Sequence, residues 1–318
     1  MQITTLIPAY KTAYIVDLLN SLRYQTVKSQ RIIISDDSPH GEFREVFHSA
    51  PFRAVVAQLP IEFHEGPRQG AYQNLKHLVK LWARRSELMH VLLDDDVIYP
   101  EFYERHLVAH ASGNFSCSVS RRWMANHVGQ PMTGQPVPEA IARTPSRMLS
   151  LTDDVIFMTT AAECKNWLGE FSNAIFRAEH CKLLLSPKLG DVSYAGLWDL
   201  GAFVAASMRA PLCHIQDHLG YFRIGPGQNS SDPNSPFMKA AHLGFVALAV
   251  GGRRLGRLGD ELARQCSRII LPALTQRYAS QADVAPFIAL VAGLATGVAG
   301  AEERFIEAWH QFLAGHGF

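Results

Sequence analysis

The sequence predicts an α/β protein in which a mostly parallel sheet is flanked by helices and followed by a small helical region. Over the first hundred residues, short apolar runs alternate with stretches of helical periodicity, the pattern of a parallel sheet with helical crossovers. From residue 236 onward only helical periodicity is left. A chain of 318 residues favours about two domains, so we expect a sheet domain at 1–235 and a helical C-terminal region at 236–318.

The candidate strands are three apolar runs, and each ends in polar residues. The runs cover 3–7, 31–35 and 88–93. Apolar residues recur at i, i+3, i+4 and i+7 over 15–22, and a similar stripe marks 71–82, which predicts amphipathic helices between the strands. Because ligands of open α/β sheets bind at the carboxyl ends of the strands, we expect the functional site at that edge.

The rest of the chain divides into an irregular part and a helical part. Residues 112–170 are rich in Ser, Gly, Pro and Thr, which predicts irregular structure and edge strands that cover a cleft. Beyond them, the spacing of apolar residues predicts C-terminal helices over 237–250, 258–270, 284–299 and 302–314.

Composition and charge describe an ordinary folded chain. It is 47% hydrophobic, and 30 Lys and Arg oppose 29 Asp and Glu, which disfavours disorder and gives no electrostatic footprint for nucleic acid. Five scattered cysteines suit the reduced thiols of a cytosol. The N-terminus lacks a signal-peptide layout, and the longest weakly polar run, 287–301, is too short and glycine-rich to span a bilayer. We expect a cytoplasmic protein, either free or peripheral at the inner face of the membrane.

The strongest chemical signal is the triplet Asp94-Asp95-Asp96 at the end of the third apolar run. Three adjacent carboxylates at a buried strand end repel one another, and a bound cation relieves that repulsion. Mg²⁺ or Mn²⁺ held by one or two carboxylates keeps coordination positions free for phosphate oxygens. A solvated turn with a helix cap at Asp96 explains the triplet equally well.

A second group of polar residues follows the first two strands. Tyr10 lies just past the first strand, and Asp36 and Asp37 end the second. An aromatic face and carboxylates at adjacent strand ends can hold a nucleobase by stacking and by accepting its N–H donors. Arg68 and Asn74 border the start of the next helix, where they can approach the same cleft. A Ser/Asp-Pro turn beside a half-buried tyrosine is the alternative interpretation.

Short motifs along the first 235 residues occur in a specific order. They are Thr5–Tyr10, Leu19–Leu22 with Gln25-Thr26, Ile32–Ser38, Gly70 with Asn74, Leu92–Asp96, Asn166–Glu170, Trp198–Leu200, and Tyr221–Arg223 running to Gln228–Ser230. Together they resemble the family 2 glycosyltransferases of GT-A fold. The resemblance does not extend to 236–318.

This resemblance implies an inverting transfer of a sugar from a nucleotide-diphosphate donor, with UDP or dTDP as the nucleotide. The acceptor would be a hydroxyl of a glycan, a lipid-linked molecule or a protein. The residues implied in the donor site are Pro8, Tyr10, Asp36, Asp37, Arg68, Asn74, Asp94, Asp95 and Arg223.

The resemblance also implies catalytic and metal-binding residues. Asp95 would face the ribose, while Asp96 and Asp94 would hold Mg²⁺ or Mn²⁺. Asp199 would be the general base that takes the proton of the acceptor hydroxyl, although a carboxylate at the start of a helix is also a common cap. Glu170, with Gly169 on the acceptor side, is the next candidate for the base.

One position departs from the family pattern. Relatives commonly carry a histidine two residues after the arginine that corresponds to Arg223, and this chain has Gly225. The ion would then take water, the diphosphate or another residue at that position, with His214 and His218 as upstream alternatives. We therefore expect weak metal retention without nucleotide.

Two other activities compete with this hypothesis. A sugar-1-phosphate nucleotidyltransferase would normally carry a glycine-rich loop after the first strand, where this chain reads Pro8–Thr12. A non-catalytic sugar-nucleotide-binding or scaffold protein would keep the pocket without the chemistry.

Two weaker patterns favour ordinary surface structure. The i, i+4 spacing of His106 and His110 fits a solvated helix face better than a zinc site. Five arginines between 253 and 268 oppose only Asp260 and Glu261, which fits a charged outer face better than contact with an anionic membrane.

Overall fold

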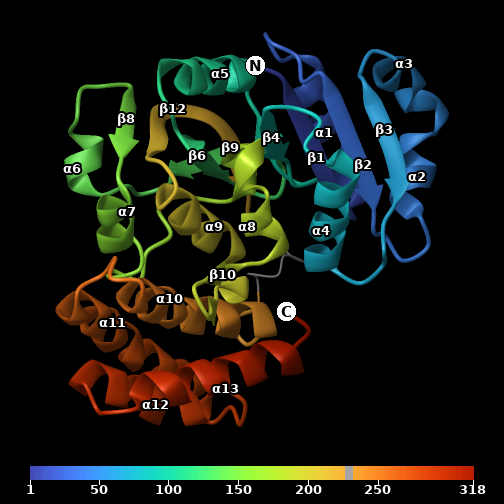
Figure 1. Ribbon diagram of the computed structural model, residues 1–318. Coiled ribbons are helices and arrows are strands. Elements are labelled where there is room, and N and C mark those ends of the chain that lie inside the picture. Colours follow the sequence, from blue (N-terminus) through green and yellow to red (C-terminus); the bar gives the residue numbers. More distant parts are fainter. Residues whose placement is uncertain (226–231) are drawn as a thin grey trace. The chain divides into compact units, whose positions relative to one another are not determined.

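The computed structural model describes residues 1–225 and 232–318 (Figure 1). The chain forms two compact units, each assembled from separate segments. Unit 1 comprises 1–150, 168–185 and 209–224, and unit 2 comprises 151–167, 186–208 and 225–318. The Gln228–Ser230 stretch of the family resemblance lies outside the described residues.

Unit 1 is built on a large mixed sheet. Its strands are β1 (Ile3–Ala9), β2 (Arg31–Asp36), β3 (Ile61–Glu65), β4 (Leu88–Val91), β5 (Val97–Ile98), β6 (Cys117–Ala125), β7 (Pro131–Gly134), β8 (Met148–Leu151), β9 (Ala174–Arg177) and β12 (Leu212–Arg223). The order is β3-β2-β1-β4-β9-β6-β12-β5, with β7 beside β6 and β8 beside β12. The first four strands in this order are mutually parallel, and β6 is parallel to β12. The central sheet is thus mostly parallel, as predicted.

Helices cover the sheet because alternate strand residues face opposite sides. The helices of unit 1 are α1 (Ile15–Arg23), α2 (Glu42–Phe47), α3 (Arg53–Val56), α4 (Ala71–Trp82), α5 (Phe102–Ser112), α6 (Glu139–Ala142) and α8 (Lys182–Leu185). Ile3 and Ile7 of β1 belong to one core cluster with Leu18 of α1 and Phe102 of α5. Helix α4 packs on β1 and β2, and its apolar stripe is buried.

Unit 2 is mainly helical. It contains α7 (Asp153–Thr159), the strand pair β10 (Lys188–Leu189) and β11 (Val192–Ser193), α9 (Trp198–Ser207), α10 (Pro236–Arg254), α11 (Asp260–Tyr278), α12 (Ala285–Thr296) and α13 (Ala301–Gly315). The buried Trp309 indole N–H of α13 donates to the Ser193 carbonyl at 2.8 Å. Lys239 of α10 forms a partly buried ion pair with Asp283 at 2.9 Å. The four predicted C-terminal helices are confirmed.

The predicted boundary at 235 follows chain order, whereas the compact units do not. Segments 151–167 and 186–208 belong with the C-terminal helices, although the sequence pattern groups them with the sheet. The expectation of irregular structure at 112–170 is also incomplete, because β6 is a nine-residue strand between β9 and β12.

The predicted solvated face at His106 and His110 is wrong. The two side chains are 0% and 2% exposed, and both ring systems contact the Ser118 hydroxyl, at 2.6 Å and 3.0 Å. Helix α5 lies against β6 and β12, so the histidines are core residues rather than surface groups, and one ring nitrogen of each has no hydrogen-bond partner among the described residues.

The arginines of unit 2 are largely neutralised within that unit. Ion pairs join Arg253 to Asp260 and Glu302, Arg254 to Asp191 and Glu303, Arg257 to Asp153, and Arg268 to Glu261. This pairing supports a charged outer face. Among the helices of the described residues, none combines the length and apolar character needed to cross a bilayer.

Candidate active site

The acidic triplet lies in the turn between β4 and β5. Val91 of β4 pairs with Leu6 of β1, and the next residue donates its backbone N–H to the Leu6 carbonyl at 2.9 Å. The chain then turns, with the Asp96 N–H donating to the Leu93 carbonyl at 3.3 Å. The aspartates are only 2–6% exposed. The triplet is therefore a buried carboxylate cluster at the carboxyl edge of the sheet, and the solvated-turn alternative is wrong.

Asp94 is held by the chain that leaves β1. Its Oδ2 accepts the backbone N–H groups of Tyr10 and Lys11, both at 2.6 Å. Burial and the neighbouring charge of Asp95 raise the pKa of Asp94 to about 7, and the two N–H donors oppose that rise. The carboxylate thus fixes the backbone beyond the first strand at an electrostatic cost.

Asp95 and Asp96 have different partners. The Lys11 ammonium forms an ion pair with Asp95. Oδ1 of Asp96 accepts the backbone N–H of Arg223 at 3.2 Å, whereas Oδ2 is buried and has no hydrogen-bond partner among the described residues. Burial and the charge of Asp95 raise the pKa of Asp96 well above its ordinary value, and the backbone N–H of Arg223 opposes the rise.

The carboxylate oxygens of the triplet are suitable ligand atoms for a hard divalent cation. Oδ2 of Asp96, buried and without a partner within 1–225 and 232–318, is a ligand atom of the kind that Mg²⁺ or Mn²⁺ prefers. A positive charge there would also offset the repulsion that raises the pKa values of Asp94 and Asp96. Across 1–225 and 232–318, no group of three or more His, Cys, Asp and Glu side chains is arranged to hold an ion, so the remaining ligands would come from water and substrate oxygens.

Arg223 is a buried tie across this end of unit 1. Its guanidinium donates to the Asp95 carbonyl at 2.9 Å, to the His127 carbonyl at 2.9 Å and to Asp17 at 2.8 Å. It also stacks over the Tyr14 ring with a centroid distance of 4.1 Å. The side chain therefore orders the turn that carries the triplet, and direct contact with a diphosphate would require some of these bonds to break.

The carboxylates at the end of β2 are committed to their own loops. Asp36 accepts the Ser38 N–H at 2.9 Å and the Arg44 N–H at 3.0 Å. Asp37 accepts the N–H of Arg68 and, at 3.2 Å, that of Gly70. These bonds hold both turns in shape.

The loop before α4 needs a glycine beside Asp37. A Cβ on Gly66 would lie 2.7 Å from both the Asp36 carbonyl oxygen and a carboxylate oxygen of Asp37. The exposed Arg68 that follows has φ of 54°. Asp37 therefore presents Arg68 at the strand edge rather than offering a free carboxylate.

Tyr10 and Asn74 have opposite environments. Tyr10 is 56% exposed at the end of β1 and is thus accessible for stacking, while Pro8 before it is half-buried. Asn74 is 1% exposed, and its amide bonds the hydroxyl and the carbonyl of Ser35 at 2.6 Å and 3.0 Å. Asn74 therefore ties α4 to β2, which is a structural role.

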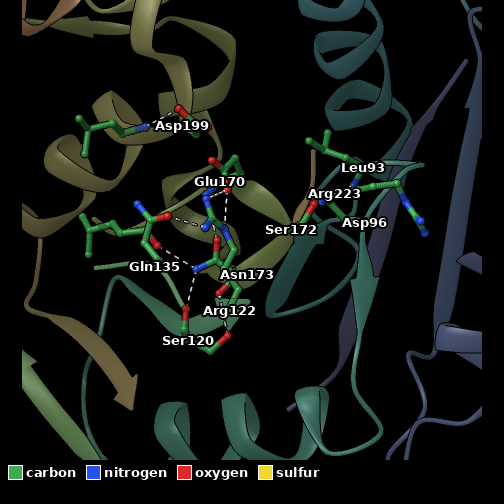
Figure 2. A network of polar contacts seen from close by, with 12 residues as sticks. Leu93, Asp96, Ser120, Arg122, Gln135, Glu170, Ser172, Asn173, Asp199 and Arg223 are labelled. Atoms are coloured by element: carbon green, nitrogen blue, oxygen red, sulfur yellow. Dashed lines mark hydrogen bonds and ion pairs between the residues drawn. The ribbon is translucent and has the colours of Figure 1, made fainter. Parts of the chain in front are cut away.

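Glu170 belongs to a dense polar network (Figure 2). Arg122 of β6 donates its Nε–H to Glu170 at 2.6 Å and bonds Gln135 at 3.1 Å. The Glu170 N–H donates to Asn173 at 2.9 Å, and Asn173 in turn bonds the Ser120 carbonyl at 2.6 Å. A carboxylate so paired orders this part of unit 1 and is not a free proton acceptor.

Gly169 has a φ of 107°, a conformation that favours glycine. A Cβ there would lie 2.4 Å from Asn173 Oδ1, so the turn into the Glu170 network admits no side chain.

Ser172 connects this network to the triplet. Its hydroxyl accepts the Leu93 N–H at 3.1 Å, as Figure 2 shows. The segment that carries Glu170 is therefore attached to the turn that carries the acidic residues.

Asp199 lies in unit 2, in the first turn of α9. Its Oδ1 accepts the N–H of the next residue, Leu200, at 2.8 Å, and the side chain is partly exposed. The N-cap of α9 is Leu197, two residues before Asp199. The alternative prediction that Asp199 is the N-cap is therefore wrong.

His218 stacks on Trp123 with ring centroids 4.1 Å apart, and His214 is 1% exposed. Burial lowers the pKa of both rings. Both histidines therefore pack within unit 1. Gly225, which stands where the family has a histidine, offers no side chain as a metal ligand.

Comparison with known proteins identifies the architecture. No protein-family model and no curated protein sequence matches the chain. Among solved structures, residues 1–349 of S. aureus TarS in complex with UDP-GlcNAc align over 98% of this chain and 92% of that one, with 14% identity and a TM-score of 0.56. The mannosyltransferase PcManGT from Pyrobaculum calidifontis, in complex with GDP-Man and Mn²⁺, aligns over 98% of this chain and 85% of that one, with 13% identity and a TM-score of 0.55. This chain shares the fold of a glycosyltransferase.

Sequence reasoning missed three residues that organise the site. Lys11 pairs with Asp95, Arg122 pairs with Glu170, and Ser172 connects the two regions. Each of the three bonds a residue that lies 48 to 84 positions away in the sequence. The one local signal was the position of Lys11 directly after Tyr10, at a predicted strand end.

Proposed function

We propose that the chain is an inverting, metal-dependent glycosyltransferase of family 2. It transfers a sugar from a nucleotide-diphosphate donor, with UDP or dTDP as the nucleotide, to a hydroxyl of a glycan, lipid-linked or protein acceptor. The observation that carries the proposal is the buried triplet at the carboxyl edge of this fold, with an Asp96 oxygen that has no hydrogen-bond partner in the described part of the chain. The solved structures of the same fold that hold UDP-GlcNAc and GDP-Man support it.

The donor site consists of groups at the ends of β1, β2 and β4. Tyr10 is exposed and offers its ring to the nucleobase. Arg68 is presented toward solvent by its bonds to Asp37, where its charge can meet a phosphate. Pro8, Asp36 and Asn74 hold the surrounding backbone, so their contribution is to shape the pocket.

In this proposal, the triplet is the part of the site that stabilises the departing nucleoside diphosphate. Asp96, together with Asp94, would hold Mg²⁺ or Mn²⁺, which when bound supplies positive charge to the departing diphosphate. Asp95 faces the ribose in this scheme, and Arg223 keeps the turn in place through the Asp95 carbonyl. All three carboxylates are buried, which strengthens their attraction for a cation.

Proton removal from the acceptor is assigned to Asp199. Its carboxylate is partly exposed at the start of α9, so it can accept a proton from a hydroxyl as that hydroxyl attacks the anomeric carbon. Direct displacement by one attacking hydroxyl inverts the anomeric configuration. Glu170 is the weaker candidate because Arg122 already neutralises it.

Turnover distinguishes this function from its competitors. The purified protein is incubated with UDP-, dTDP- and GDP-sugars and Mn²⁺, and release of nucleoside diphosphate is measured. Slow hydrolysis of one donor is expected, because water can replace the missing acceptor. Binding without any release would identify a scaffold, and formation of a nucleotide sugar from nucleoside triphosphate and sugar-1-phosphate would identify a nucleotidyltransferase.

A further inference from the structure

The side chain that directly follows the exposed Tyr10 reaches back into the acidic triplet. Lys11 donates its backbone N–H to Asp94 at 2.6 Å, and its ammonium forms an ion pair with Asp95. Both ends of this one residue are therefore attached to adjacent carboxylates. The Asp95 side chain is 8% exposed, and that of Lys11 is 31% exposed, so the ammonium enters from the solvent side.

Lys11 supplies positive charge where a metal ion would supply it. The triplet concentrates three carboxylates in one turn, and Lys11 attracts all of them, Asp95 most strongly and then Asp94 and Asp96. A second cation of this region, Arg223, directs its guanidinium to the main-chain oxygens of Asp95 and His127 and to Asp17. Lys11 differs from it in that its ammonium pairs with a carboxylate of the triplet.

We propose that Lys11 is a resident counter-cation that competes with the divalent ion for the triplet. This inference rests on the proposed function. Two cations beside the same carboxylates repel each other, so an incoming ion must displace the ammonium or bind weakly beside it. A partly exposed lysine can leave Asp95 and turn toward a bound diphosphate, because its four-carbon stem is flexible. Lys11 thus acts as a positioning residue that makes firm metal binding depend on the donor.

The competition is tested by measuring the affinity of the protein for Mn²⁺ in the absence of nucleotide. Titration calorimetry or electron paramagnetic resonance gives this affinity. Lys11→Met removes the charge and keeps the stem, and it should tighten Mn²⁺ binding about tenfold or more. Lys11→Arg keeps the charge and should stay within about twofold of wild type. Lys80→Met, at an exposed position of α4, is the matched control and should leave the affinity unchanged.

Thermal unfolding provides a readout that does not depend on activity. In chelator, Lys11→Met should melt at a lower temperature than Lys80→Met because its triplet is left without the counter-charge, and Mn²⁺ should restore more of its stability than it adds to wild type. Equal Mn²⁺ affinity in wild type and Lys11→Met, or absence of binding in both, overturns the competition. Failure of the proposed function looks different, because no nucleotide sugar would then bind or turn over in wild type.

Discussion

Oδ1 of Asp96 accepts the backbone N–H of Arg223 at 3.2 Å, although the two residues are 127 positions apart. The bond joins the acidic turn after β4 to the last residue of β12. The Arg223 guanidinium then reinforces the same junction through the Asp95 carbonyl. The geometry of the triplet therefore depends on a strand from the far end of unit 1, and this dependence can be measured.

Arg223→Ala should lower the free energy of unfolding by about 3 kcal/mol, because it leaves the Asp95 and His127 carbonyls without their donor. Arg223→Lys should recover less than half of the loss, since an ammonium cannot reproduce the planar fork. The measurement is denaturant unfolding in chelator. Arg85→Ala, at an exposed site, is the control and should stay within about 0.5 kcal/mol of wild type. A similar small effect at Arg223 would contradict the structural role.

Asp94→Asn should stabilise the metal-free protein at high pH. The pKa of Asp94 is about 7 in the folded chain against an ordinary value of 3.8. The folded state therefore binds a proton between these values that the unfolded chain does not bind. This contribution is present at low pH and is lost as the pH rises through 7. The variant, whose amide oxygen can still accept from Tyr10 and Lys11, should be more stable than wild type at pH 8 by on the order of 3 kcal/mol.

The gain should disappear near pH 4, where the wild-type carboxyl is neutral. Melting temperatures of both proteins across pH 4–8 in chelator check this prediction. A constant difference between the two proteins at all pH values would show that Asp94 does not titrate in this range.

His90 should produce the opposite dependence. Burial lowers its pKa to about 4, and its ring bonds the Tyr103 hydroxyl and the Ser172 carbonyl. In the unfolded chain His90 binds a proton with its ordinary pKa of 6.5, whereas in the folded chain it stays neutral until the pH approaches 4. The free energy of unfolding therefore falls as the pH drops from about 6.5 toward 4. This residue alone should cost about 2 kcal/mol at pH 5.

His90→Gln should be less stable than wild type at pH 8 but should lose less stability on acidification. Unfolding free energies at pH 8 and pH 5 give the comparison. Parallel losses in the two proteins would exclude His90 as a source of acid sensitivity.

Local patterns were sufficient for part of the fold. The stripe that begins at Ile15 and the one that begins at Ala71 match α1 and α4, and the apolar runs match β1, β2 and β4. The triplet was found because it directly follows a buried run. In these cases the periodicity of burial is contained within a dozen residues.

Strands β6 and β12 did not stand out in the sequence pattern, because their burial depends on residues far away in the sequence. Strand β6 contains Arg122, which is 5% exposed because Glu170 neutralises it from 48 positions away. Strand β12 contains His214 and His218, so it lacks the apolar alternation of a typical strand. The ion pair of Lys11 and Asp95 is invisible for the same reason, because it exists only once β1 and β4 are adjacent.

Asp199→Asn should separate chemistry from binding. If Asp199 is the general base, the substitution should lower the turnover number by about 10²- to 10⁴-fold with little change in donor affinity. Transfer kinetics and donor titration in parallel give the two quantities. Glu170→Gln is the informative comparison, because it breaks an ion pair with Arg122 and should mainly lower stability. Full turnover in Asp199→Asn would move the base elsewhere.

The central claim is that the buried triplet holds the donor through a divalent ion, and donor binding tests it most directly. Melting temperatures are measured for wild type and Asp96→Ala with UDP-, dTDP- and GDP-sugars, each with Mn²⁺ and with chelator. At about 100 times its dissociation constant, a true donor adds about 2.7 kcal/mol of stability. We predict such a shift for at least one nucleotide sugar in wild type with Mn²⁺, and its loss in chelator and in folded Asp96→Ala. A wild-type protein that no nucleotide sugar stabilises, or an Asp96→Ala variant that is stabilised as much as wild type, would contradict the account.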